Sequence, residues 1–549
     1  MLLIFPPAAK PCEPPAGIAR LAAALSAHGV PCTLLDANLE GMLFLLQQPR
    51  TASDTWTRRA IKNIDANLAA LRDPDTYRSP DKYGRAVKDV NRALEASAKE
   101  HHAILGFADY HHETLSPVRS KDLIYSAGHP EQNPFYPYFT ERLPGVLEET
   151  FSQRGRGERE EKLQAGDSHE EKTGLPIVGF SLNYLSQALC AFAMIGYLKK
   201  AFPAVKVVLG GGLVSSWVKR PGWKDPFGGL VDHLIAGPGE RTLLELLGRK
   251  DVKQAYSAAD YGSLPLREYL SPGLILPYSG SSGCYWNKCS FCPETAEDNP
   301  YLPVPAGQAM QDLASLVAET KPMLIHLLDN SVSPALMAAI ADRPLGVPWY
   351  GFARIGRELL DIDYCMALKR SGCVMLKLGL ESGDQGVLDR MQKGIDLKDA
   401  SRVLGNLQRA GIAAYVYLLF GTPAETISEA RKTLEFVVAH KDAVTFLNLA
   451  VFNMPLCGQE AGEYETEQFY EGDLSLYTGF THPAGWDRKT VRRFLENEFK
   501  KHPAISAILK NDPPLFTSNH AAFFCRGRGI HNPTKGISPQ RTQRSQRKT

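Results

Sequence analysis

Short apolar strands alternate with helices in two separate parts of this chain of 549 residues. Parallel strands need a crossover connection of a dozen or more residues, usually a helix, so this alternation predicts parallel β-sheets covered by helices. We therefore expect an α/β protein with two parallel sheets. The first series of predicted strands comprises residues 2–5, 32–36, 176–182, 205–212 and 232–240. The second series comprises residues 274–277, 323–328, 349–353, 375–380, 415–420 and 444–449.

The order of these strands divides the chain into four parts. Residues 1–262 are expected to form a doubly wound parallel sheet, interrupted at about 39–174 by an insertion that is helical in part and disordered in part. Residues 263–455 contain six β/α units, which suggest a partial barrel with its ligands at the carboxyl ends of the strands. Residues 456–525 are expected to form a small helical cap, and the basic tail 526–549 is expected to be disordered.

Three shorter segments carry local predictions. Thr422-Pro-Ala-Glu425 has the pattern of a capping box, which would begin a helix with proline in its first turn. The run Pro134-Phe-Tyr-Pro-Tyr-Phe139 is more apolar than exposed segments usually are, so we expect it to pack against a neighbour. The charged stretch from Gln153 to Lys172 is expected to be mobile.

Composition excludes several classes of protein. Lys and Arg sum to 62 and Asp and Glu to 60, and the resulting charge of +2 indicates neither a nucleic-acid-binding surface nor an acidic disordered chain. The longest mostly apolar stretch, 185–198, is too short to span a bilayer, and the N-terminus lacks a signal-peptide pattern. The ten cysteines are scattered apart from one close group, unlike a secreted disulfide framework. We expect a cytoplasmic protein with no membrane partner and no clear nucleic-acid partner.

The close group consists of Cys284, Cys289 and Cys292, a C-x4-C-x2-C run directly after the first strand of the second series. Structural zinc sites use four ligands, and no second Cys-x-x-Cys or nearby Cys-His pair completes one here. Four-iron clusters also usually take four cysteines, so a trio leaves one iron open to another ligand. Three buried core cysteines are the alternative, although such spacing among turn residues is unusual for a core.

This trio, on the loop after the first strand of a partial β/α barrel, resembles the signature of the radical S-adenosylmethionine (SAM) superfamily. The first gap is one residue longer than the usual C-x3-C-x2-C, and Phe291 fills the aromatic slot before the third cysteine. The resemblance implies a 4Fe-4S cluster held by Cys284, Cys289 and Cys292, with SAM on the open iron. It also implies an external reductant such as flavodoxin or ferredoxin, and chemistry through a 5′-deoxyadenosyl radical.

The resemblance assigns five further barrel residues to SAM. Asp329 lies where family members carry a motif that holds the SAM amine, although it could equally cap the following helix. Arg354 could pair with a SAM carboxylate or with Glu381, since its planar guanidinium suits carboxylates. Glu381 and Ser382 are assigned to the ribose or the methionine part. Phe420 is assigned to the adenine, with a plain helix-entry turn as the alternative.

The N-terminal part resembles the cobalamin-binding domain that precedes many radical SAM barrels. The resemblance rests on the Pro-Pro loop and on glycine turns at strand ends, where backbone can approach a ligand closely. It implies that cobalamin, a third cofactor, contacts Ser181, Gly210, Gly211, Gly237 and Glu240.

The D-x-H-x-x-G motif of other cobalamin proteins is absent, because Asp167-Ser-His169 continues differently. Cobalamin would therefore bind without that axial histidine, or the domain has lost this ligand.

We expect a radical SAM enzyme that uses cobalamin for radical methylation or a related C–H functionalisation of a small-molecule or peptide substrate, whose identity the sequence leaves open. One alternative is a radical SAM isomerase, cyclase or oxidoreductase without functional cobalamin. Another is a non-catalytic iron–sulfur protein that transfers electrons or acts as a sensor. The remaining cysteines lack ligand spacing, so we expect no second cluster, but Cys457 could reach the active site as a radical partner.

Overall fold

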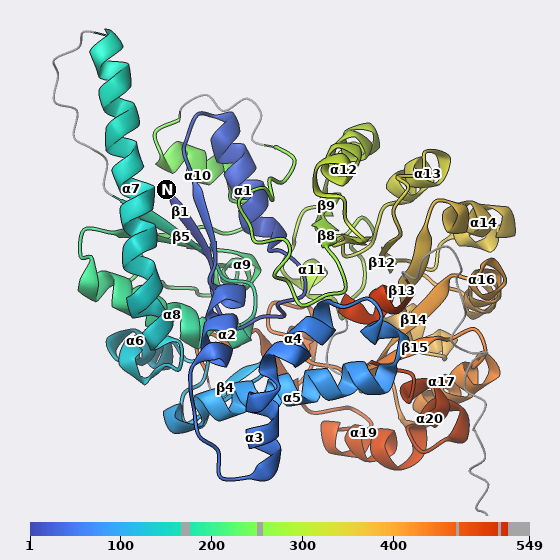
Figure 1. The fold of residues 1–549 in the computed structure, drawn as a ribbon. Helices are drawn as coiled ribbons and strands as arrows, with labels where there is room; N and C mark the ends of the chain where they lie inside the picture. Colours follow the sequence, from blue (N-terminus) through green and yellow to red (C-terminus); the bar gives the residue numbers. More distant parts are fainter. Residues whose placement is uncertain (166–175, 250–255, 468–471, 514–517, 525–549) are drawn as a thin grey trace, which may run out of the picture.

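The computed structural model spans the whole chain and describes residues 1–165, 176–249, 256–467, 472–513 and 518–524. Two parallel sheets stand side by side, with the first part of the helical insertion below them and its last part to the left of the N-terminal sheet (Figure 1). The expected α/β class is therefore confirmed. Within the described residues, no helix combines the length and the apolar run that a bilayer crossing requires.

The N-terminal sheet has five parallel strands in the order β2-β1-β5-β6-β7. Helices α8 and α9 pack in the apolar core on one face, and α1 and α10 pack in the core on the other, as in a doubly wound sheet. The strands are β1 (Leu2–Phe5), β2 (Thr33–Asp36), β5 (Ile177–Ser181), β6 (Lys206–Gly210) and β7 (His233–Leu234). The helices are α1 (Ala16–Ala27), α8 (Leu185–Ala201), α9 (Gly212–Val218) and α10 (Glu240–Leu246).

The insertion leaves the sheet at Asp36, whose carboxylate accepts a hydrogen bond from the Leu39 amide and so caps the next helix. The predicted aromatic run is confirmed as packed, because Phe135, Tyr138 and Phe139 are buried. The elements of the insertion are α2 (Ala37–Gln47), α3 (Thr55–Lys62), α4 (Ile64–Arg72), η1 (Thr76–Arg78), α5 (Pro80–Ala98), η2 (Lys99–His101), β3 (Ala103–Leu105), β4 (Tyr110–His112), α6 (Ser120–Gly128), η3 (Pro130–Gln132) and α7 (Tyr136–Ala165).

The charged stretch that begins at Gln153 is helical in its first part. Helix α7 continues to Ala165, and residues 166–172 lie outside the described part of the chain. Mobility of this stretch stays a prediction.

The second sheet has six parallel strands in the order β15-β14-β13-β12-β11-β8. Since β8 and β15 are its two edges, it is an open partial barrel, as predicted. Its strands are β8 (Ile275–Tyr278), β11 (Leu324–Leu327), β12 (Trp349–Ala353), β13 (Cys373–Glu381), β14 (Ala413–Phe420) and β15 (Phe446–Val451). The connections hold β9 (Ser281–Ser282), α11 (Pro293–Ala296), β10 (Leu302–Pro303), α12 (Ala306–Thr320), α13 (Pro334–Asp342), η4 (Arg357–Leu360), α14 (Ile362–Arg370), α15 (Gln385–Arg390), α16 (Leu397–Ala410) and α17 (Ile427–Ala439).

The capping box of α17 lies one turn later than predicted. Thr426 and Glu429 form it, and the helix begins at Ile427. Glu425 instead turns back to accept a hydrogen bond from the Gly421 amide at 2.5 Å. Two Thr-x-x-Glu sets follow one another there, 422–425 and 426–429, and the second set forms the capping box.

The C-terminal part closes the amino end of the barrel. Phe524 packs on Phe446 of β15, while Phe523 packs on Tyr77 and Tyr83 of the insertion. The expected cap was helical, but it also contains an antiparallel sheet in the order β16-β18-β17. Its elements are β16 (Met454–Pro455), α18 (Glu460–Glu463), β17 (Thr466–Glu467), β18 (Tyr477–Phe480), α19 (Arg488–Phe494), η5 (Leu495–Phe499), α20 (Pro503–Leu509) and η6 (Ser518–Phe524). The predicted disordered tail, 526–549, lies outside the described residues.

Candidate functional site

The three cysteines lie on the loop that follows β8, at the carboxyl end of the barrel strands. Cys289 is buried, and Cys284 and Cys292 are half-buried. Burial raises the pKa of Cys292 to about 11, although the amides of Glu294 and Thr295 oppose this rise by stabilising the thiolate. Burial also raises the pKa of Cys289, while the nearby cations Lys393 and Arg354 lower it.

Three thiols on one loop beside two cations form a donor set that fits an iron–sulfur cluster, since soft thiolate ligands suit iron–sulfur clusters. In the part of the chain that the structure describes, no three Cys, His, Asp or Glu side chains stand at metal-binding separation. The cysteines are therefore neighbours on a shared loop, and their sulfurs are not gathered around one point.

Asp329 fixes the start of this loop. Its carboxylate accepts hydrogen bonds from the Gly280 amide at 3.0 Å and from the Ser281 hydroxyl at 2.5 Å, and the residue is only 2% exposed. The alternative that Asp329 caps the next helix is wrong, because Ser333 caps α13. Asp329 thus links the end of β11 to the segment that leads into Cys284.

A second set of contacts holds the middle of the loop. The Arg354 guanidinium stacks over the Trp286 ring at 3.9 Å and donates to the Lys393 carbonyl at 2.6 Å. The Trp286 indole donates to the Gln392 carbonyl at 3.1 Å. The suggested pairing of Arg354 with Glu381 is wrong, since Glu381 pairs with the Lys393 ammonium at 2.8 Å. Arg354 acts as a clamp between Trp286 and the segment after α15.

The other predicted SAM residues have mixed environments. Ser382 is fully buried and its hydroxyl lies 3.2 Å from the Thr433 hydroxyl, which attaches β13 to α17. Phe420 is also fully buried and packs on Phe499 of the C-terminal part. Phe291 is half-buried, with the Lys393 ammonium 5.4 Å from its ring centre.

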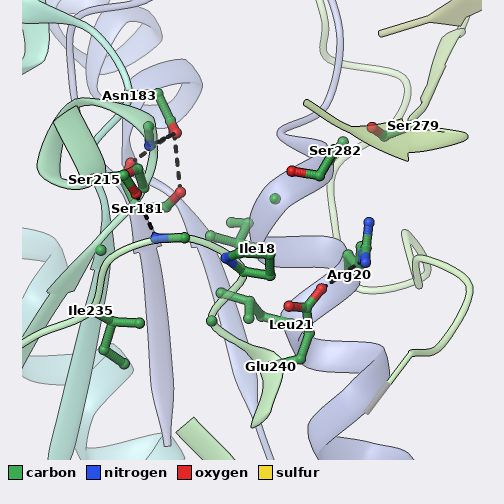
Figure 2. Close-up of a pocket in the computed structure, with 18 of the residues that line it drawn as sticks. Ile18, Arg20, Leu21, Ser181, Asn183, Ser215, Ile235, Glu240, Ser279 and Ser282 are labelled. Carbon is green, nitrogen blue, oxygen red and sulfur yellow. Dashed lines mark hydrogen bonds and ion pairs between the residues drawn. The ribbon is translucent and has the colours of Figure 1, made fainter. Parts of the chain in front are cut away.

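All five predicted cobalamin contacts line one cavity of about 650 Å³ at the carboxyl ends of the N-terminal strands. Figure 2 shows Ser181 at the left of this cavity, Ser279 and Ser282 of the barrel at the upper right, and Glu240 lower down beside Arg20. Gly283, the residue before Cys284, also lines it. The structure therefore brings Ser181, Gly210, Gly211, Gly237 and Glu240 together and opposes them to the cysteine loop.

Local contacts hold the residues that the N-terminal sheet contributes to this cavity. Gly211 has a φ of +109°, and a Cβ there would overlap the Leu182 carbonyl oxygen. The Asn183 side chain donates to the Ser181 hydroxyl at 3.1 Å, as Figure 2 shows. Glu240 forms an ion pair with Arg20 at 2.6 Å. On the side of the N-terminal sheet, the cavity thus meets glycines, two hydroxyls and the Glu240 carboxylate, whose charge is paired with Arg20.

A second cavity, of about 1090 Å³, extends into the barrel lumen. It is lined by the Pro-rich loop after β1, by residues 108–119 of the insertion, and by His326 and Lys377 on the barrel strands. The two cavities share part of their walls, formed by Ala16, Gly17, Ser181, Asn183 and Leu328. Cys457, suggested above as a radical partner, is not among the described residues that line either cavity.

The polar residues of this lumen were not predicted from the sequence. Glu13 accepts from the His326 ring nitrogen Nδ1 at 3.0 Å, and the Lys377 ammonium lies 3.4 Å from Nε2 of the same ring. A usable signal existed, because His326 and Lys377 interrupt otherwise apolar strands, where a polar side chain usually needs a partner. Glu13 lies 313 residues from His326, and no local pattern could pair them.

Comparison with known proteins finds a family similarity in the barrel and partial matches to two relatives. Residues 278–437 match the model of the radical SAM superfamily. An uncharacterized methyltransferase of Pyrococcus horikoshii is 24% identical over 186 residues, which cover 32% of this chain and 39% of that protein. An uncharacterized protein of Methanopyrus kandleri is 31% identical over 81 residues, 14% of each chain. The matches thus span well under half of these two relatives.

The fold extends the likeness to nearly the whole chain. The structure of the radical SAM methyltransferase TsrM from Kitasatospora setae, solved with tryptophan substrate and a SAM analogue, superposes with a TM-score of 0.52 at 14% identity. The match covers 93% of this chain and 89% of TsrM. The chain thus carries a region similar to the radical SAM superfamily, residues 278–437, within an overall fold similar to that of TsrM.

Proposed function

We propose that this protein is a cobalamin-dependent radical SAM methyltransferase. The observation that carries the proposal is the cavity of about 650 Å³, because the glycine and serine wall of the N-terminal sheet faces the loop that bears the cysteines. The methyltransferase fold of TsrM and the methyltransferase named among the sequence relatives support methyl transfer. The shared wall with the larger cavity supports a substrate bound next to the cofactors.

Three cysteines, Cys284, Cys289 and Cys292, would hold a 4Fe-4S cluster in this proposal. When bound and reduced, such a cluster with SAM supplies a carbon-centred radical, and cobalamin supplies a methyl group. The protein residues position and shield these groups. Lys393 and Arg354 favour the thiolate of Cys289, and Asp329 holds the entrance of the cysteine loop. Phe524 packs on Phe446 at the amino end of the barrel, opposite the cysteine loop.

The test is anaerobic reconstitution of the full-length protein with iron and sulfide after growth with cobalamin. Incubation with SAM and a low-potential reductant, such as reduced flavodoxin or ferredoxin, should yield 5′-deoxyadenosine or S-adenosylhomocysteine, both measured by mass spectrometry. The visible spectrum of the purified protein should show cobalamin. Cys289→Ala should lose the cluster absorbance and SAM consumption, whereas Cys365→Ala should retain both, since Cys365 is buried in α14 and bonds the Leu359 carbonyl.

The outcomes of this test distinguish the proposed function from its alternatives. SAM consumption by the Cys289→Ala variant would refute the cluster assignment. SAM consumption without bound cobalamin would replace the proposal by a radical SAM isomerase, cyclase or oxidoreductase. A redox-active cluster that leaves SAM intact would replace it by an electron-transfer or sensor protein.

A further inference from the structure

A trio of titratable residues, two of them buried, lies in the lumen of the barrel. Glu13, from the Pro-rich loop after β1, reaches His326 on β11, with both carboxylate oxygens 3.0 Å from Nδ1. Lys377 on β13 approaches the other ring nitrogen, Nε2, at 3.4 Å. His326 and Lys377 are only 7% and 5% exposed, and all three residues line the larger cavity. The trio thus joins the N-terminal part of the chain to two barrel strands.

The contacts fix the proton on His326. A carboxylate only accepts, so Nδ1 carries the hydrogen that Glu13 receives, and Nε2 of the neutral ring accepts from the Lys377 ammonium. Burial favours this neutral form, because it lowers the pKa of His326. Tyr350 stacks on the imidazole at 4.3 Å with the rings 7° from parallel, which holds the ring in place.

Lys377 has donors left over. An ammonium offers three hydrogens, and within the described residues its one hydrogen-bond acceptor is Nε2 of His326. The ammonium otherwise lies over the rings of Tyr350 and Phe352, at 5.0 and 4.9 Å from their centres. Burial lowers the pKa of Lys377 to about 8, as expected for a cation with too few acceptors.

Several charged groups lie around Lys377. Glu13, Lys10, Cys12 and His326 act on its pKa, and Asp109, Glu113 and Arg119 also line the cavity. Because Nε2 of His326 takes one hydrogen of the Lys377 ammonium, the remaining hydrogens can reach an acceptor on a ligand in the cavity. A carboxylate matches this cation with one negative charge, while the nearby Glu13 carboxylate disfavours a more highly charged group such as a phosphate dianion.

We infer that the larger cavity binds an organic substrate through a carboxylate that accepts hydrogen bonds from Lys377. This inference rests on the proposed function and narrows its substrate class to small carboxylic acids. The remainder of such a substrate would lie along the cavity toward Leu328, which also lines the smaller cavity. Lys377 is then a substrate-binding residue, and Glu13 and His326 are positioning residues that hold its ammonium.

Matched pairs of ligands test this inference on the full-length reconstituted protein. The probes are 3-phenylpropionate, indole-3-propionate and hexanoate, each compared with its primary amide by isothermal titration calorimetry at pH 7. We expect at least one acid to bind at least roughly tenfold more tightly than its amide, because hydrogen bonds to charged groups discriminate at this level. Lys377→Met should remove the preference for the acid. Lys369→Met is the control, since Lys369 lies in α14 on the outside of the barrel and bonds the Gly411 carbonyl.

A measurement on the unmodified protein covers the case in which Lys377→Met fails to fold. Affinity of the acid should fall at least roughly tenfold between pH 7 and pH 10 as Lys377 loses its proton, while affinity of the amide should not. Equal binding of acids and amides, absence of binding by all three acids, or an acid preference that survives Lys377→Met would overturn the inference. Binding needs neither reductant nor SAM, so its failure is distinguishable from failure of SAM consumption.

Discussion

Replacing Glu425 by glutamine should change how stability depends on pH. The Glu425 side chain is fully buried, where it accepts from the Gly421 amide at 2.5 Å and from the Trp486 indole at 3.0 Å. Burial dominates these two favourable contacts and raises its pKa from 4.5 to about 7. The carboxyl thus keeps its proton in the folded protein at pH values where the unfolded chain has lost it.

The size of the effect follows from this difference in pKa. A shift from 4.5 to about 7 corresponds to about 3 kcal/mol, at 1.36 kcal/mol per pH unit. Because the folded pKa is the higher one, the wild type has this stability below pH 4.5 and loses it as the pH rises to 7. Glutamine cannot ionise and keeps an oxygen for the same two donors. The free energy of unfolding of Glu425→Gln, relative to the wild type, should therefore rise by about 3 kcal/mol between pH 4.5 and pH 8.

Thermal unfolding of both proteins from pH 4.5 to pH 8 measures this difference. About 3 kcal/mol corresponds to roughly 6 °C or more in melting temperature for a unit of 150–250 residues. Glu429→Gln is the control, because the Thr426 hydroxyl lowers the pKa of Glu429, so its carboxylate is ionised throughout this range and the difference between this variant and the wild type should change little. A difference between Glu425→Gln and wild type that is constant over the pH range would refute the reasoning.

Two further substitutions test the cysteine loop. Gly283 has a φ of +74°, and a Cβ there would overlap the Pro300 carbonyl, so Gly283→Ala should cost about 1–3 kcal/mol and reduce the iron bound per chain. Gly307→Ala, in α12 with open space around its Cβ position, should be neutral or stabilising and keep full iron content. Lys393→Met should lower the unfolding free energy by about 3–5 kcal/mol by leaving the Glu381 carboxylate, 12% exposed, without its partner. Adding Glu381→Gln to that variant should recover part of the loss, and a strictly additive double-mutant cycle would contradict the pairing.

Strand positions were the most predictable part of this protein. Strand β12 occupies Trp349–Ala353 as expected, because a short run of bulky apolar residues between turn residues leaves few alternatives. The five glycine, serine and glutamate positions of the smaller cavity were also accessible from sequence. They follow strand ends, and parallel strands bring their carboxyl ends to one edge.

Side-chain partners were less predictable, since they depend on distances in space. Arg354 and Glu381 looked complementary in the sequence, yet Lys393 reaches Glu381 first and Arg354 stacks on Trp286. The sequence left Asp329 open between a SAM contact and a helix cap, and the loop after β8 takes both of its oxygens. In each case the residue type was informative about the kind of contact and uninformative about the partner.

The shared wall of the two cavities constrains any group transfer between them. Leu328 follows β11 of the barrel, and Ser181 and Asn183 lie at the end of β5 in the N-terminal sheet. Two ligands, one in each cavity, would therefore meet at this shared wall, which residues of both sheets form. The relative position of the sheets then fixes the distance between the ligands. Glu13 bears on this directly, because it belongs to the N-terminal part and holds a barrel histidine. Weakening that contact should disturb the alignment of the two cavities before it disturbs either one alone.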